Sequence, residues 1–202
     1  MRTYGNERLE FEFRLGHKTG GGGAQTTGGA QTTGGGFRPG VDGDAWARLK
    51  GALDGSASLA KTHSVTTERI DATGSKLVLD SSEQPVCIIH KKRLGDRDFS
   101  TDSPWCARAS LSLEEREDTT TTTVKHVYER RKERWSYTFQ CWSVDLTRVA
   151  GNLPHQLDDD RESYEVEIEL KDTSELFVRT ADHVVKWGWD LVGDMCRLLQ
   201  QV

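Results

Sequence analysis

The sequence predicts a β-dominated α+β protein whose antiparallel strands form a closed barrel with a polar interior and a few outer helices. Many short segments alternate polar and apolar residues with a period of two, which is typical of strands, whereas only two segments have helical spacing. Several of these segments carry charges of a single sign on their polar face. Closure into a barrel also leaves no sheet edge exposed, which suits a chain with so many strands.

The composition predicts one globular domain over residues 1–202. Hydrophobic residues make up 35% and charged residues 29% of the chain, and both fractions are ordinary for a globular protein. The mean hydropathy of -0.65 is low for so many strands, which suggests that some strand faces contact polar groups other than bulk solvent. The net charge of -5 argues against broad adhesion to nucleic acid, so we expect no DNA partner and only local phosphate recognition.

Other broad classes of protein are not indicated. The first residues lack the apolar core of a signal peptide, and no apolar run reaches 18 residues, so we expect a soluble, intracellular chain without membrane contact. The four cysteines form no CxxC pair and therefore predict neither a disulfide framework nor a zinc site. The sequence also lacks a P-loop and the GxSxG and HExxH motifs.

The first predicted strand covers residues 9–15, in which apolar and charged side chains alternate without exception. Glycine is dense over residues 20–36, where GGAQTT occurs twice, and this predicts a flexible insert; a repeat expansion without function is the alternative. Apolar spacing predicts a short helix over 44–54, capped by an aspartate, and a longer one over 181–202. Further strands are expected at 64–70, 76–80, 86–93, 106–114, 124–149 and 163–170, with a polar loop at 115–123.

The polar faces of two predicted strands carry charges of opposite sign: Glu165, Glu167 and Glu169 on one, and Arg130, Lys132 and Arg134 on the other. Like charges at alternate positions lie about 7 Å apart, so each strand repels itself unless opposite charges face it. A sandwich with polar faces in solvent explains any single strand. Strands of opposite sign that close on one lumen explain the segregation of charge, and this favours the barrel.

Clustered glutamates predict a site for a hard divalent cation, Mg²⁺ or Mn²⁺, because carboxylates held close together need a compensating charge. A single ExE pattern is usually a solvated strand face, whereas two such patterns opposite basic strands are more specific. The candidate metal ligands are Glu10, Glu12, Glu165, Glu167 and Glu169.

Basic residues on the polar faces are candidates for binding phosphate oxygens and for balancing the charge that develops during phosphoryl transfer. A carboxylate such as Glu114 can orient an attacking water. Together with the metal site, this chemistry predicts a metal-dependent phosphohydrolase. The candidate phosphate ligands are Arg14, Lys91, Arg93, Arg108, Arg130, Lys132 and Arg134.

Four motifs in order, LEFEFR, ERRKERWSY, WSVDLTRV and YEVEIEL, resemble the fungal and protozoan type of metal-dependent RNA 5'-triphosphatase, a branch of the triphosphate tunnel metalloenzyme superfamily. The resemblance covers nearly the whole chain outside the glycine-rich insert. It implies metal binding by Glu10, Glu12 and Glu169, with support from Glu165 and Glu167. It further implies that basic residues hold the triphosphate and that two others orient them: Arg93, Arg108, Lys132 and Arg134, with Asp145 and Thr147.

The resemblance implies removal of the γ-phosphate from the 5'-triphosphate end of nascent pre-mRNA, the first step of mRNA capping, in the nucleus. It also suggests an RNA guanylyltransferase as partner, and a glutamate that positions water, for which Glu114 is the first choice and Glu129 the reserve. Two alternatives stay open. One is a tripolyphosphatase or nucleoside triphosphatase of the same fold, and the other is a barrel that binds polyphosphate or metal without catalysis.

Overall fold

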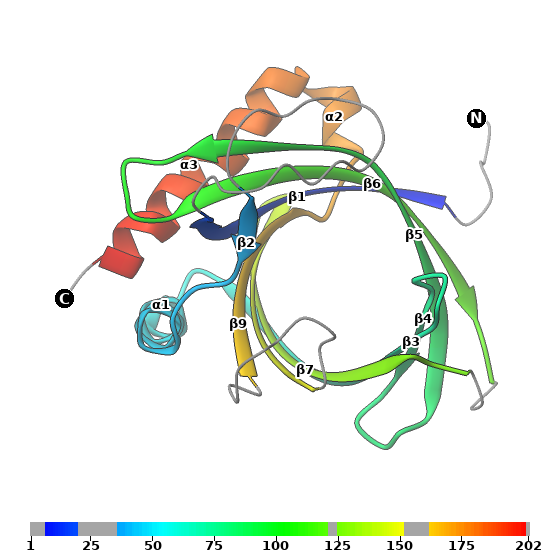
Figure 1. The fold of residues 1–202 in the computed structure, drawn as a ribbon. Coiled ribbons are helices and arrows are strands. Elements are labelled where there is room, and N and C mark those ends of the chain that lie inside the picture. The colour runs from blue at the N-terminus through cyan, green and yellow to red at the C-terminus, as the bar shows by residue number, and fades with distance from the viewer. Residues whose placement is uncertain (1–6, 20–35, 121–124, 152–161, 201–202) are drawn as a thin grey trace.

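The computed structural model is a barrel of antiparallel strands with helices on its outside, and it describes residues 7–19, 36–120, 125–151 and 162–200 (Figure 1). Eight strands follow one another around the ring in the order β1-β6-β5-β4-β3-β7-β8-β9, and the pairing of β1 with β9 closes it. The short strand β2 (Phe37–Pro39) adds to β1 outside the ring. The eight strands of the ring are β1 (Glu7–Lys18), β3 (Ala60–Ile70), β4 (Lys76–Leu79), β5 (Pro85–Ser100), β6 (Cys106–Asp118), β7 (Tyr128–Phe139), β8 (Trp142–Gly151) and β9 (Glu162–Leu170).

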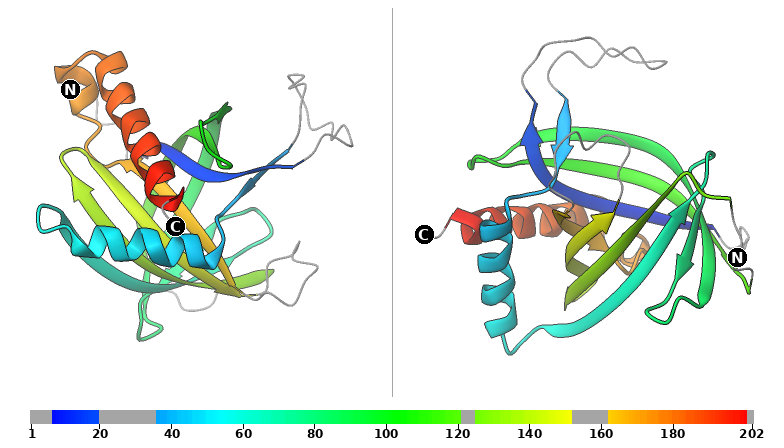
Figure 2. Two further views of the ribbon diagram at one scale, coloured as in Figure 1. Left: turned by 90° about the vertical axis from the view of Figure 1, so that its left-hand side faces the viewer. Right: turned by 60° about the horizontal axis from the view of Figure 1, so that its bottom comes forward.

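The hydrophobic core lies between the outer face of the barrel and two helices, α1 (Gly43–Gly55) and α3 (Ala181–Gln200). Both helices lie on the same side of the barrel and contact each other (Figure 2). A further four-residue helix, α2 (Glu175–Val178), precedes α3. The outward residues of β1, β8 and β9 are buried beneath these helices, including Phe13, Leu15, Trp142, Leu146 and Ile168. Because the apolar side chains point outward, the alternate positions of the same strands face the lumen.

The predicted fold class is confirmed, and the differences from prediction concern its details. The strand predicted over 86–93 continues to Ser100, because a bulge between Arg93 and Gly95 shifts the register and keeps β5 paired with β6. The polar loop predicted over 115–123 is wrong in its first part, since β6 runs to Asp118. Asp42 rather than Asp44 caps α1, accepting a hydrogen bond from the Ala45 amide at 2.7 Å.

Two short elements, β2 and α2, were missed, because three or four residues give too little periodicity to detect. The predicted glycine-rich insert lies outside the described residues except for Gly36, whose carbonyl accepts from the Thr19 amide at 2.7 Å. All four cysteines are buried and unpaired. In the described part of the chain, no helix combines the length and the apolar character that crossing a membrane requires.

Gly188 is a point of close contact between α3 and the barrel. A Cβ at this position would lie 2.5 Å from the Trp142 ring and 2.8 Å from the Phe13 ring, and both rings are buried. We predict that Gly188→Ala lowers the free energy of unfolding by about 2 kcal/mol, because the buried rings cannot yield without strain. Urea denaturation followed by circular dichroism measures the change.

Gly193→Ala is the matched control for this prediction. Gly193 lies on the same helix, and its added Cβ would meet only the Arg197 side chain at 3.6 Å. The control should gain about 1 kcal/mol from helix propensity alone. Equal effects of the two substitutions would contradict the tight packing of α3 on the barrel.

Candidate active site in the barrel interior

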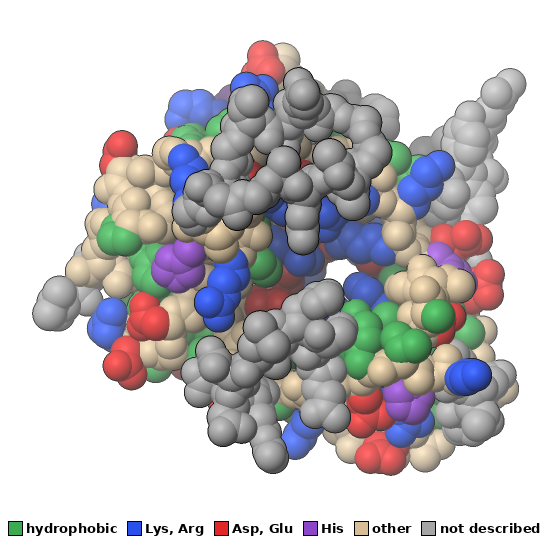
Figure 3. Space-filling model, in the orientation of Figure 1, with side chains coloured by type: hydrophobic (Ala, Val, Ile, Leu, Met, Phe, Trp, Pro, Cys, Tyr) green, Lys and Arg blue, Asp and Glu red, His purple; other side chains and the backbone are tan. Residues whose placement is uncertain are grey.

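The barrel encloses a lumen bordered by charged side chains of both signs, visible as blue and red atoms around the central opening in Figure 3. The strand registers place alternate residues of every long strand on this inner face. Every residue predicted for the site lies there except Glu129, the reserve choice for positioning water. The charged inner residues include Glu10, Glu12, Arg14, Glu68, Lys76, Lys91, Arg93, Asp96, Asp98, Arg108, Glu114, Arg130, Lys132, Arg134, Asp145, Glu165, Glu167 and Glu169.

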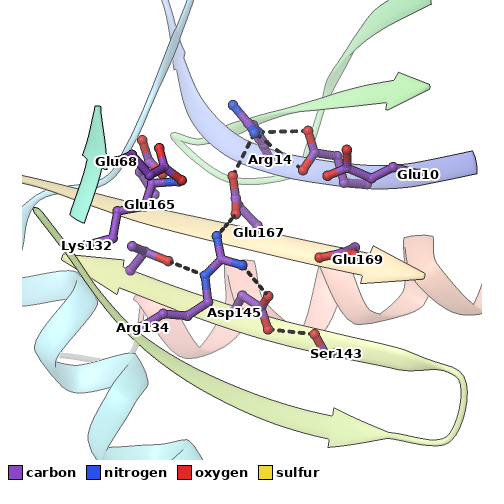
Figure 4. A network of polar contacts seen from close by, with 12 residues as sticks. Glu10, Arg14, Glu68, Lys132, Arg134, Ser143, Asp145, Glu165, Glu167 and Glu169 are labelled. Atoms are coloured by element: carbon purple, nitrogen blue, oxygen red, sulfur yellow. Dashed lines mark hydrogen bonds and ion pairs between the residues drawn. The ribbon is translucent and has the colours of Figure 1, made fainter. Parts of the chain in front are cut away.

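The carboxylate of Glu167 lies at the centre of this network, between two arginines from different strands (Figure 4). Arg14 Nη2 on β1 is 2.9 Å from one of its oxygens, and Arg134 Nη2 on β7 is 3.2 Å from the other. Burial alone would raise the pKa of Glu167, but the two guanidinium groups outweigh burial and hold that pKa far below its usual range. Glu167 is therefore an ionised, fully paired carboxylate that ties β1 and β7 together through β9.

Arg134 also contacts the two residues predicted to orient it. Its Nη1 is 3.3 Å from Oδ2 of Asp145, and its Nε donates to the Thr147 hydroxyl at 3.2 Å. The Ser143 hydroxyl donates to the other oxygen of Asp145 at 2.6 Å. Asp145 and Thr147 are fully buried, so they fix the plane of the guanidinium group.

Glu10 and Glu12 of β1 share the ammonium group of Lys91. Lys91 Nζ is 2.7 Å from Glu10 Oε2 and 3.6 Å from Glu12 Oε1. Burial, followed by the neighbouring Glu167 carboxylate, raises the pKa of Glu12 to about 7. Arg14 and Lys91 lower this pKa, but they do not fully offset the effect of burial. Across the strand pairing, Glu12 lies directly opposite Glu169 of β9.

Arg14 Nε is a donor left without a hydrogen bond in the described part of the protein. It lies 3.0 Å from Glu12 Oε1, close enough for an ion pair but not aligned for a hydrogen bond, and it is buried. A buried N–H of this kind has a free-energy cost, which the ion pair with Glu12 offsets in part.

Glu68 on β3 is an inner residue that the sequence reasoning missed. Its carboxylate accepts a hydrogen bond from Arg130 Nε at 2.6 Å and lies 3.2 Å from Lys132 Nζ. Glu68 therefore links two of the predicted phosphate ligands. Burial would raise the pKa of Glu68, but the charges of Lys132 and Arg130 outweigh burial and lower that pKa to about 2. The strand parity of β3 could have indicated this glutamate, since Ser64, Thr66 and Glu68 alternate on its polar face.

Arg108 and Arg93 lie along β5 and β6, where aspartates of the extended β5 pair with them. Arg108 makes two hydrogen bonds to Asp98, at 2.7 and 3.0 Å, and its guanidinium group lies 4.5 Å from the centre of the Phe37 ring. Arg93 pairs with Asp96 at 2.8 Å and is largely exposed. The sequence reasoning did not include these aspartates, because the strand was predicted to end at residue 93.

Of the two glutamates considered for orienting water, Glu114 lies on the inner face and Glu129 does not. Glu114 borders a cavity of about 370 Å³ with Arg8, Arg116 and Asp118. Burial and then the Glu10 carboxylate raise the pKa of Glu114, which makes it a better proton acceptor. Glu129 is directed to the outside of β7, where it pairs with Arg69 at 2.7 Å.

The acidic wall fits a divalent cation by the chemistry of its oxygens. Glu10 and Glu12 alternate on β1, and Glu169 lies opposite Glu12, so three carboxylates lie on one part of the inner face. In the described residues these carboxylates are paired with lysine and arginine, and no three acidic, histidine or cysteine side chains converge closely enough to hold an ion. Both oxygens of Glu167 are paired with arginines, so this glutamate is not free to bind a cation directly and would only support the site.

The sequence profile of the family described as "mRNA capping enzyme, beta chain" matches residues 60–185. The chain belongs to this family. It is 26% identical over 192 residues to the 5'RNA triphosphatase of Paramecium bursaria Chlorella virus 1, covering 95% of this chain and 90% of the viral protein. The four motifs therefore predicted the family correctly. The match also confirms that the chain is a hydrolase with RNA triphosphatase activity.

Two solved structures of the S. pombe RNA triphosphatase Pct1 share the fold of this capping-family chain. One has a TM-score of 0.75 and the other, a complex with the Spt5 CTD, has 0.77; each is 18% identical and covers 94% of this chain. The matches cover 84% and 86% of the Pct1 chains. The tunnel fold is thereby confirmed, and membership of the capping family supports the use of a divalent cation.

We predict a pH-dependent contribution of Glu68 to stability. Because the folded pKa of about 2 lies below the ordinary 4.5, this contribution is complete above about pH 4.5 and is lost as the pH falls toward 2. Glu68→Gln should therefore lower the free energy of unfolding by about 3 kcal/mol at pH 7, with a difference that shrinks at pH 2.5. Urea denaturation of both proteins across this range measures it.

Glu129→Gln is the matched control, because Glu129 pairs with an arginine between the same two strands, but on the outer surface. An exposed pair of this kind contributes only about 0.5 kcal/mol. A Glu68→Gln protein that is as stable as this control at pH 7 would show that Glu68 does not hold Arg130 and Lys132 in place.

Proposed function

We propose that this chain removes the γ-phosphate from the 5'-triphosphate end of nascent RNA by attack of water, with a divalent cation bound at the acidic wall of the lumen. The observation that carries the proposal is the combination of a group of glutamates on β1 and β9 with a row of basic side chains on β7, all on the inner face of one closed barrel. Membership of the mRNA capping enzyme beta-chain family supports RNA as the substrate. The viral relative, named as a 5'RNA triphosphatase, supports the same choice.

The basic wall binds the triphosphate. Arg130, Lys132 and Arg134 project from alternate positions of β7, about 7 Å apart along the strand, so their long side chains can reach different oxygens of one triphosphate. Each is held by a carboxylate behind or beside it, so the side chains are oriented before substrate binds. Arg14 adds a further positive charge from β1, where Glu12 and Glu167 hold its guanidinium group.

These cations also lower the barrier to phosphoryl transfer. The reaction proceeds through a loose transition state in which charge spreads over the phosphate oxygens, so fixed positive groups stabilise it without covalent chemistry. Arg134 suits this task best, because Asp145, Thr147 and Glu167 fix its guanidinium plane inside the lumen.

The acidic wall holds the cation. Glu10, Glu12 and Glu169 would bind Mg²⁺ or Mn²⁺, with Glu165 and Glu167 in support, and the ion when bound supplies polarisation of the γ-phosphate. Glu114 orients the water and accepts its proton. Its inner-face position, its cavity and its raised pKa support that role.

Two further proposals follow from the place of this reaction in capping. The diphosphate end that remains is the substrate for transfer of a guanylyl group, so an RNA guanylyltransferase is the expected partner. Capping acts on nascent pre-mRNA, so the nucleus is the expected site of action. Structures of the related S. pombe protein include a complex with the Spt5 CTD, which is a different partner.

We predict that the protein releases one phosphate from triphosphate-ended RNA in the presence of Mg²⁺ or Mn²⁺, and that Glu169→Gln lowers this rate about a hundredfold through loss of a cation ligand. The assay compares triphosphate-ended RNA, ATP and tripolyphosphate with each metal. The matched control is Glu175→Gln, which removes an outer ion pair with Arg179 and should leave the rate unchanged.

The outcomes separate the three candidate functions. Preferred hydrolysis of the RNA end supports the proposal. Hydrolysis of ATP or tripolyphosphate with an untouched RNA end would favour the alternative of the same fold. Binding of polyphosphate without any release would identify a non-catalytic barrel.

A further inference from the structure

Lys171 follows β9 and holds two carboxylates of the barrel interior at once. Its Nζ is 2.6 Å from Oε2 of Glu169 and 3.2 Å from Oδ2 of Asp145. Asp145 is fully buried, whereas the lysine side chain is 35% exposed at the end of the strand. Lys171 continues the inner-face parity of Glu167 and Glu169, but its charge is opposite to theirs.

The position of this ammonium group affects cation binding, because Glu169 is a proposed ligand; the inference therefore rests on the proposed function. A carboxylate oxygen 2.6 Å from an ammonium group is already neutralised. A divalent cation at the same oxygen must displace the ammonium group or bear its repulsion, which is strong at such short range and away from bulk water.

Arg8 also lies near Glu169, but its effect should be weaker. Its Nη2 is 3.5 Å from Oε1, and its side chain is 53% exposed, so solvent and salt screen it more. Lys171 is closer and less exposed, and Asp145 anchors it. It can therefore leave Glu169 and keep a carboxylate partner.

We propose that Lys171 is a built-in counter-ion that weakens the affinity of the barrel for its divalent cation. In the substrate-free protein it neutralises the carboxylate of Glu169, so this ligand has a counter-ion without a metal. Strong cation binding then requires the extra negative charge of a triphosphate in the lumen. Lys171 thus favours joint binding of cation and triphosphate over binding of the cation alone.

The test measures Mn²⁺ binding to the full chain without substrate by isothermal titration calorimetry. Lys171→Met removes the charge and keeps most of the side-chain length, and it should bind Mn²⁺ about tenfold more tightly than wild type. Lys171→Arg keeps the charge and should stay within about twofold of wild type. The control Lys186→Met alters an exposed lysine paired with Asp190 on α3 and should change nothing.

Unchanged or weaker Mn²⁺ binding by folded Lys171→Met would overturn the proposal and assign Lys171 to the positioning of Glu169. Lys171→Gln, which can still donate to Asp145, provides the same comparison if the methionine variant does not fold. A failure of the proposed function is recognised separately. In that case Glu169→Gln would bind Mn²⁺ as tightly as wild type.

Discussion

Charge neutralisation inside a closed barrel is the constraint on which the rest of the structure depends. The buried Glu167 carboxylate is stable only because Arg14 and Arg134 reach it from β1 and β7, so an ion network links three strands across the lumen. The outer face must then carry the apolar core, and α1 and α3 cover it. If the apolar faces pointed inward instead, the charged faces of the strands would lie under the helices, where glutamates without a partner are costly to bury.

The parity of the strands could be predicted from sequence because the period of two is local, and it assigned Glu165, Glu167 and Glu169 to one face without knowledge of the neighbouring strands. Charge segregation then indicated the closed lumen. The partner of each charge could not be predicted, because it depends on register between strands far apart in the chain. The pairing of Lys171 with Asp145 was missed for this reason, and so was the extension of β5 that brings Asp98 to Arg108. Glu68 differs, because the local parity of β3 could have indicated its position but not its partners.

The same interactions that make the substrate-free barrel stable prepare it for substrate. Basic side chains that would bind phosphate are already oriented by carboxylates, as Lys132 is by Glu68 and Arg134 by Asp145. Glu12 is the carboxylate that is most costly to keep ionised, since burial and then Glu167 raise its pKa to about 7. A cation would add positive charge beside the glutamates of β1 and β9, and a triphosphate would add negative charge beside the basic residues of β7. The two ligands together would therefore keep the charge of the lumen balanced.

The most direct test of this account is a crystal structure with Mn²⁺ and tripolyphosphate, in which anomalous scattering locates the ion independently of the protein atoms. The account predicts an anomalous peak on the carboxylates of Glu10, Glu12 and Glu169, with the phosphates along Lys132 and Arg134. A peak outside the lumen, or one at Asp96 and Asp98 on β5, would contradict the assignment of the acidic wall.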